Sequence, residues 1–326
     1  MSRYLAARAV EIAVTLVLMS FIVYLLIWLM PGDPIDMMIS GDPKMTSADA
    51  ARLRAVYGVD KPLLERYAAW AAQALHGNFG YSRSFGQPVL DVLGPRLVNT
   101  FELAGIAFVL SIAIALPLGI WAAARPRSRA DYLINLFCFA GISTPPFWLA
   151  LLLITLFAVA LGWLPAGGMA ELRSGTPWQT IVTQKLRFAI LPVLTLTLLQ
   201  LGTYTRFMRG AMIETLRQDF IRTARAKGAG ERGVLLGHAF ANALAPMLTV
   251  LGLSFGGLFS GALITETMFA WPGMGKAIYN AILDNDYNLA LVGLLIATFA
   301  TIVGNLLADL ALVAVDPRVS IAERDQ

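Results

Sequence analysis

Residues 103–124 read LAGIAFVLSIAIALPLGIWAAA and contain no Asp, Glu, Lys or Arg. A helix needs about 20 apolar residues to cross a hydrocarbon layer about 30 Å thick, because each residue rises about 1.5 Å along the helix axis. Five further windows with few or no charges occur at residues 10–30, 132–160, 188–205, 239–265 and 287–308. The sequence therefore predicts an all-α, polytopic membrane protein with six transmembrane helices.

The composition of the whole chain supports this prediction. The 326 residues are 57% hydrophobic and 14% charged, with a mean hydropathy of +0.67, whereas soluble domains carry about 25% charged residues. Membrane topology accounts for the net charge of +4, so no nucleic-acid partner is expected. One cysteine, Cys138, and two histidines, His76 and His238, exclude a disulfide framework and a Cys/His zinc site.

Lys and Arg residues beside the windows predict the orientation, because retained cations favour the cytoplasm. Both ends of the chain, the link after window 103–124 and the link after window 188–205 carry cations, so both termini are expected to be cytoplasmic. The predicted parts are residues 1–30 (cytoplasmic N-terminus and first span), 31–96 (external helical insertion), 97–315 (five-helix core with the cytoplasmic loop 206–240) and 316–326 (cytoplasmic tail). Window 10–30 is interpreted as a retained anchor, because it exceeds the about 7 to 15 residues of a signal-peptide core.

The external insertion carries seven acids and seven cations and is therefore close to neutral. Residues 46–49 predict a helix start that leads into residues 50–57, and Lys61-Pro62 opens a second amphipathic helix over residues 63–75. Three glycines, Gly77, Gly80 and Gly86, then indicate loops. The pattern fits a cap that stabilises the first spans as well as a docking element.

The basic segment 206–240 has the pattern of an amphipathic helix-turn-helix. Phe220, Ile221 and Ala224 can share one helix face, and Gly228 interrupts the helix before the apolar residues 234–236. A solvated, positive-inside loop would explain the charge alone. The apolar residues on both arms favour a second interpretation, in which the segment lies along the membrane and docks a partner.

Two strings resemble nucleotide-binding motifs but lack the required context. Residues 228–233 match G-x-G-x-x-G, yet an Arg-rich helical stretch precedes them instead of a strand. Residues 273–277 resemble the end of a phosphate-binding loop, but they lack its first glycine and its hydroxyl residue. No ATP site is expected on this chain.

The fifth window, residues 239–265, is rich in small residues whose spacing lets helices approach closely. They serve either tight packing or a pathway-lining helix, and the two interpretations stay open. The acids near the windows, Glu102, Glu266 and Asp309, lie toward span ends, where snorkelling or pairing is possible. No buried proton relay is therefore predicted.

Taken together, several strings resemble one transporter family. Residues 219–228 (DFIRTARAKG) and 238–246 (HAFANALAP) are similar to the cytoplasmic coupling loop of ABC-importer permeases in its peptide-permease form. The strings that resemble the B-type permease subunit of dipeptide, oligopeptide and nickel importers are PGDP at 31–34, YGVDKP at 57–62, GNFG at 77–80, NTFEL at 99–103, ETMFAWPGMG at 266–275 and DPR at 316–318. Where the broader family has glutamate in the loop, this chain has Arg222.

The resemblance implies a type I ABC importer permease in a bacterial inner membrane. Its implied partners are a homologous C-type permease, two ABC ATPases that hold ATP and Mg²⁺, a periplasmic solute-binding protein that delivers peptides, and membrane lipid. The implied ATPase-coupling residues are Arg222, Thr223, Ala224, Arg225, Ala226, Lys227 and Gly228. The expected path residues are Thr249, Gly252, Ser254, Gly256 and Ser260, and the expected binding-protein contacts are Trp271, Pro272 and Gly273.

Two alternatives accompany this interpretation. The same architecture could import nickel, glutathione or oligosaccharides. A stand-alone channel or secondary transporter is a different class, and it would need a charged relay or filter within the spans, which the sequence does not display. An intramembrane enzyme lacks a candidate catalytic constellation, because Cys138 has no histidine near it in sequence.

Overall fold

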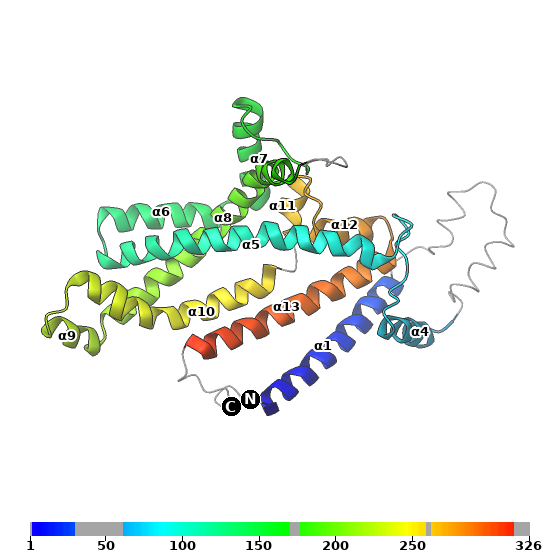
Figure 1. Cartoon of the computed structure of the whole chain (residues 1–326), viewed down its shortest axis with the longest axis horizontal. Helices are drawn as coiled ribbons and strands as arrows, with labels where there is room; N and C mark the ends of the chain where they lie inside the picture. The colour runs from blue at the N-terminus through cyan, green and yellow to red at the C-terminus, as the bar shows by residue number, and fades with distance from the viewer. Residues whose placement is uncertain (1, 30–60, 170–176, 259–261, 316–326) are drawn as a thin grey trace. The chain divides into compact units, whose positions relative to one another are not determined.

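In the computed structural model, the described backbone covers residues 2–29, 61–169, 177–258 and 262–315. These residues are mostly helical, and the described part of the chain contains one isolated antiparallel bridge, Tyr81 to Pro88, and no strand. The all-α prediction is therefore confirmed for these ranges (Figure 1). The helix predicted over residues 50–57 lies outside them.

The helices follow one another along the chain, and two of them, η1 and η2, are π-helical. They are α1 (Ser2–Trp28), α4 (Leu63–Leu75), α5 (Val89–Ala124), α6 (Arg129–Ser143), α7 (Pro146–Leu153), η1 (Ile154–Ala160), α8 (Trp178–Leu216), α9 (Asp219–Ala226), η2 (Gly233–Ala239), α10 (Phe240–Gly257), α11 (Leu263–Met268), α12 (Met274–Leu283) and α13 (Tyr287–Val315).

The helices confirm the membrane-spanning prediction with one correction. Within the described ranges, five stretches are long and apolar enough to cross a membrane, and they lie in α1, α5, α8, η2 with α10, and α13. The sixth candidate combines α6 with α7 and η1, and the two parts meet at an angle of 104°. The window at residues 132–160 is therefore a broken span or a re-entrant loop, and it does not form one straight helix.

Two consecutive prolines explain the bend. A residue that precedes proline is disfavoured in the α region, because it clashes with the following ring. Thr144 and Pro145 each precede a proline, and both have extended backbone, with ψ angles of 124° and 136°. Pro146 then begins α7, where no N–H donor is needed. The sequence window was defined by its lack of charged residues. Prolines carry no charge, so this criterion did not indicate the bend.

Two other windows differ in length from the helices that contain them. Residues 188–205 lie inside α8, which has 39 residues and is about 58 Å long, nearly twice the hydrocarbon thickness. Residues 206–216, which we assigned to the basic loop, are therefore a continuation of α8. The window at 239–265 is interrupted, because α10 ends at Gly257 and α11 begins at Leu263.

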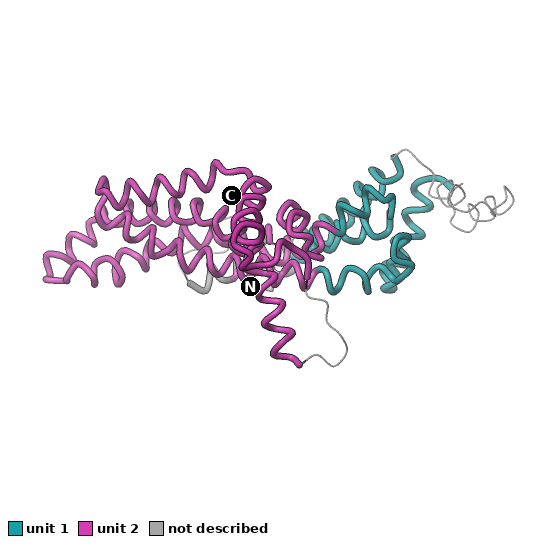
Figure 2. Tube along the Cα trace, turned by 90° about the horizontal axis from the view of Figure 1, so that it is seen from above, with its two compact units in different colours: residues 1–96, 277–299 teal, residues 97–276, 300–326 magenta. Residues whose placement is uncertain are grey.

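The chain divides into two compact units, residues 1–96 with 277–299 and residues 97–276 with 300–326 (Figure 2). In the first unit, α4 packs on α1. The Tyr67 hydroxyl lies 2.7 Å from the Ser20 hydroxyl, and the Tyr67 ring meets the rings of Phe21 and Tyr24 edge to face. The helix predicted over residues 63–75 is confirmed, and aromatic side chains fasten it to α1.

Asp286 organises a second contact within this unit. Its carboxylate accepts hydrogen bonds from the Ser82 hydroxyl, from the Ser84 N–H at 3.0 Å and from the Leu289 N–H at 3.3 Å. The last bond caps the start of α13. Asp286 therefore fastens the loop of residues 77–88 to the turn between α12 and α13.

We expect Asp286→Ala to raise the rate of tryptic cleavage after Arg83 by about tenfold, because loss of a helix cap costs about 0.5–2 kcal/mol and favours local opening. Limited proteolysis of the detergent-solubilised protein measures this rate. Asp284→Ala is the matched control, since Arg83 contacts the Asp284 backbone carbonyl and not its side chain. Equal cleavage rates for the two variants would contradict the assigned role of Asp286.

In the second unit, α8 is the central helix. It packs against α6, α7 and α10, and α10 also contacts η2. A buried apolar cluster, which we call the elbow core, draws residues from α5, α8, α9, η2 and α10. Its members are Ala115, Ala123, Tyr204, Met208, Met212, Ile221, Val234, Ala239, Ala243 and Met247. The elbow core joins the short helix α9 to three long helices.

Candidate functional site

The candidate site is the elbow formed by the end of α8, by α9 and by the start of η2. Figure 1 shows α9 at the end of its unit, where α8 and α10 come together. Ile221 is completely buried in the elbow core, and it is the buried residue of α9. A short helix has little stability of its own, so this apolar anchor holds α9 in place.

The turn after α9 is closed by hydrogen bonds and an ion pair. The N–H groups of Gly228 and Ala229 donate to the carbonyls of Arg225 and Ala224 at 3.0 and 3.1 Å. Gly228 has a φ of 86°, a left-handed conformation that favours glycine. The Arg225 guanidinium contacts both carboxylate oxygens of Glu231 at 3.0 and 3.3 Å. These contacts fix the path of the chain where it leaves α9.

The structure brings the predicted coupling residues together on this elbow. Six of them are exposed, namely Arg222, Thr223, Arg225, Ala226, Lys227 and Gly228. Ala224 is half-buried, on the side of α9 that also carries Ile221. The elbow therefore exposes a polar, cationic surface, while its apolar side is fixed to the long helices.

The elbow also contains the G-x-G-x-x-G string. Residues 228–233 form the turn between α9 and η2, and a helix precedes them. The strand that gives this motif its meaning is absent from the described elements around it. The string therefore lies in a helix-to-helix connection and not in the strand-to-helix turn that a dinucleotide site uses.

The predicted path residues do not form one described site. Thr249 is exposed, Gly252 is buried, and the Ser254 hydroxyl donates to the Val250 carbonyl at 2.9 Å within α10. Gly256 lies in α10 without described surroundings, and Ser260 lies outside the described residues. Their role in a path stays a prediction.

The predicted binding-protein contacts lie mostly in the interior. Trp271 is 1% exposed, and its indole N–H donates to the Asn99 carbonyl at 3.1 Å. The Asn99 side chain in turn donates to the Pro272 carbonyl at 3.0 Å. Gly273 is also buried. This loop is folded onto α5, so the Trp271 ring offers no surface to a soluble partner in this conformation.

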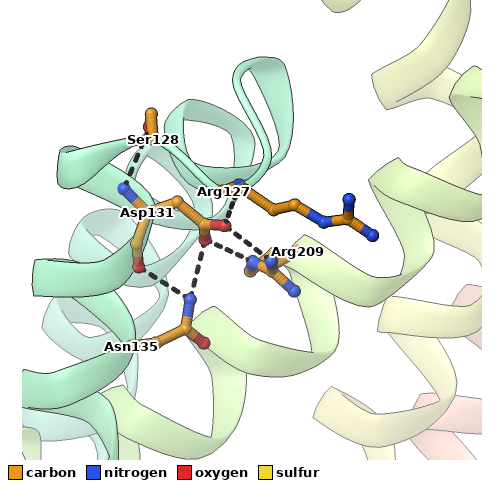
Figure 3. A network of polar contacts seen from close by, with 5 residues as sticks. All are labelled: Arg127, Ser128, Asp131, Asn135 and Arg209. Carbon is orange, nitrogen blue, oxygen red and sulfur yellow. Dashed lines mark hydrogen bonds and ion pairs between the residues drawn. The ribbon is translucent and has the colours of Figure 1, made fainter.

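Sequence reasoning placed Glu266 near a span end and did not identify Asp131. Glu266 is fully buried, and its carboxylate accepts from the Thr100 hydroxyl at 2.7 Å and from the Lys276 N–H at 2.9 Å. Asp131 is 3% exposed and pairs with Arg209 of α8 (Figure 3). The Ser-x-x-Asp pattern at Ser128 could have indicated a helix start, but no local pattern indicates a partner 78 residues away.

Among the described residues, five helices long and apolar enough to cross a membrane and a bent sixth candidate, together with an amphipathic elbow at the end of one unit, define a multi-pass membrane protein. The chain belongs to the family described as binding-protein-dependent transport system inner membrane component, which residues 115–321 match. Residues 1–104 match the N-terminal family of the same transport systems. The protein is accordingly a permease subunit of an ABC importer and a multi-pass inner-membrane protein.

Named relatives align with nearly the whole chain. The oligopeptide transport system permease protein AppB of Bacillus subtilis is 34% identical over 320 residues, which cover 98% of this chain and 99% of that protein. A protein of Sinorhizobium fredii named "probable peptide ABC transporter permease protein" is 35% identical over 320 residues, with the same coverage. The "probable D,D-dipeptide transport system permease protein DdpB" of Escherichia coli is 36% identical over 313 residues, which cover 91% of this chain and 92% of that protein.

Proposed function

We propose that this permease subunit imports peptides and that it is not itself an enzyme. The full-length similarity to permeases named for peptides, oligopeptides and D,D-dipeptides is the observation that carries the proposal. A homologous C-type permease would form the other half of the translocation path. A solute-binding protein would deliver the peptide from the periplasm.

The orientation in this proposal follows from the cations. Both termini and the elbow lie in the cytoplasm, because Arg and Lys gather at the ends of the chain, after α5 and between α8 and α10. Residues 31–96 then lie on the periplasmic side with the binding protein. Two ABC ATPases hold ATP and Mg²⁺ below the elbow, and this chain binds neither.

Energy coupling in this proposal passes through α9. The exposed residues from Arg222 to Gly228 fit a groove of an ATPase, and closure of the ATPase pair displaces α9. Ile221 passes this displacement to the elbow core, which includes residues of α5, α8 and α10. A packed core transmits a displacement because it is dense and has few alternative arrangements. The path that opens would be lined by the small residues Thr249, Gly252, Ser254 and Gly256 of α10 and by Ser260.

Reconstitution into proteoliposomes tests the proposal. The chain is combined with the second permease, the two ATPases and the binding protein, and uptake of labelled di- and oligopeptides is measured with and without ATP. We expect peptide uptake that depends on ATP and on the binding protein. Uptake of nickel, glutathione or oligosaccharide in place of peptides would correct the substrate, and failure of any ATPase to copurify would contradict the coupling role.

We expect Gly228→Leu to reduce uptake about 5- to 30-fold in the same assay, because a side chain in the left-handed region costs about 1–2 kcal/mol and disfavours the turn after α9. Gly230→Leu is the matched control. It lies two residues away and has equally open space around its β-carbon, but it lacks a positive φ. Equal uptake by the two variants would show that the shape of this turn is not needed for coupling.

A further inference from the structure

The helices α6 and α8 pack together, and their backbones approach closely at Gly202. A β-carbon at Gly202 of α8 would lie 2.5 Å from the Cys138 carbonyl oxygen of α6. Next to this contact the Arg206 guanidinium lies 4.5 Å from the centre of the Phe139 ring. The two helices therefore pack backbone against backbone, and a cation–π contact adds to the packing.

An ion pair closes this interface at the end nearest α9. The Arg209 Nε and Nη2 atoms donate to the two carboxylate oxygens of Asp131 at 2.6 and 2.7 Å. The Asn135 side chain donates to the same carboxylate at 2.7 Å. Asp131 is 3% exposed, so its carboxylate is buried. The planar Arg209 guanidinium contacts this carboxylate through two parallel hydrogen bonds, which fix the geometry of the pair.

The same carboxylate also holds the turn between α5 and α6. The Arg127 N–H donates to Asp131 at 2.8 Å, while the Arg127 side chain extends away from it (Figure 3). Arg127 has a φ of 65°, which is uncommon for a residue with a side chain. The Ser128 hydroxyl accepts from the Asp131 N–H and caps α6. Asp131 therefore connects α8 both to α6 and to the turn between α5 and α6.

The position of Arg209 in α8 gives this connection a mechanical consequence. Arg209 lies seven residues before the end of α8 at Leu216, which is about 10 Å along the axis. Pro192 lies inside the same helix, and an internal proline removes one backbone hydrogen bond and permits bending. A displacement applied at α9 could therefore bend α8 unless its final turns are fastened to a neighbouring helix.

We propose that Asp131 and Arg209 are positioning residues for energy coupling, because they fasten α6 and the α5–α6 turn to the part of α8 that carries α9. A displacement of α9 then moves α5, α6 and α8 as one body. The inference rests on the proposed function of the elbow. It adds a specific pair of residues outside the elbow that determines how much of the displacement reaches the membrane helices.

The ratio of peptide uptake to ATP hydrolysis in the assembled, reconstituted transporter tests the pair. We expect Asp131→Asn and Arg209→Gln to lower this ratio about tenfold, a typical size for lost coupling between sites, while ATP hydrolysis continues. Glu102→Gln is the matched control, because Glu102 forms an ion pair between α5 and α8 through Lys185 with both side chains more than a third exposed. A wild-type ratio in the two variants would overturn the proposal.

A covalent replacement distinguishes coupling from general damage to the fold. The double variant Asp131→Cys/Arg209→Cys, made in a chain with Cys138→Ala, is measured before and after treatment with a short thiol-to-thiol reagent. We expect a low ratio before treatment and recovery afterwards, since the link restores the fastening without the charges. A ratio that stays low in the cross-linked, assembled complex overturns the proposal. Absence of uptake by the wild-type complex would instead contradict the proposed function.

Discussion

An Ile221→Asp variant is expected to insert into the membrane and assemble with its partners, yet to lose about 1000-fold of its peptide uptake. Ile221 is completely buried in the elbow core, and it is the buried side chain of α9. Truncating a buried side chain of this size costs about 2–5 kcal/mol, and the unpaired carboxylate adds to this cost. Every 1.4 kcal/mol changes an equilibrium about tenfold, so α9 would spend nearly all its time detached from the core.

In the proposed coupling mechanism, detachment separates ATP hydrolysis by the partner ATPases from peptide uptake by the complex. The exposed face of α9 can still reach an ATPase, so ATP hydrolysis continues, while the displacement no longer reaches α5, α8 and α10. Parallel assays of hydrolysis and peptide uptake in proteoliposomes measure this separation. Ile221→Val is the matched control, because it removes one methyl group and costs about 0.5–1.5 kcal/mol. Uptake near the wild-type level in Ile221→Asp would refute the role of Ile221 as the anchor.

The sequence predicts those features of the fold that depend on residues near one another in the chain. Apolar windows located the spans because the hydrocarbon thickness sets the length of an apolar helix. The apolar positions of 220–224 and the glycine at 228 predicted α9 and its exit, and both are present. The prolines at 145 and 146 cause the bend of the third window. A search for stretches without charged residues does not take prolines into account.

Features that depend on distant residues were not predictable in the same way. The chain shows Asp131 and Arg209 as two ordinary charges in separate basic regions, and only the packing of α6 against α8 brings them together. Trp271 was expected at an external docking surface, because the resemblance to peptide permeases implied a binding-protein contact there. In the structure its indole N–H instead donates a hydrogen bond to the Asn99 carbonyl in the interior. The sequence alone does not indicate this contact between distant residues.

The loop that contains Trp271 is also the site of a large expected effect on stability. Gly273 lies against the buried carboxyl group of Glu266, and a β-carbon at this position would overlap that group. The carboxylate cannot move freely, since it accepts hydrogen bonds from the Thr100 hydroxyl and the Lys276 N–H. Thr100 also accepts the Met274 N–H at 2.7 Å. One added methyl group therefore disturbs three connected hydrogen bonds.

We expect Gly273→Ala to lower the free energy of unfolding by about 3–5 kcal/mol, since overpacking costs about 1–3 kcal/mol and each disrupted bond to a charged group about 1.5–3 kcal/mol. Denaturation in mixed micelles, followed by tryptophan fluorescence, measures the change. Gly210→Ala in α8 is the control, because no atom lies within 4 Å of its β-carbon and alanine favours a helix by up to about 1 kcal/mol over glycine.

A double-mutant cycle attributes the effect to the carboxyl group itself. Glu266→Ala alone should destabilise, because it leaves the Thr100 hydroxyl and the Lys276 N–H without their acceptor. In the Glu266→Ala background the β-carbon of Ala at position 273 has no carboxyl group to displace. The combined loss should therefore be smaller than the sum of the two single losses by about 1–3 kcal/mol, as for residues in direct contact. Additive losses would place the strain at another neighbour of Gly273.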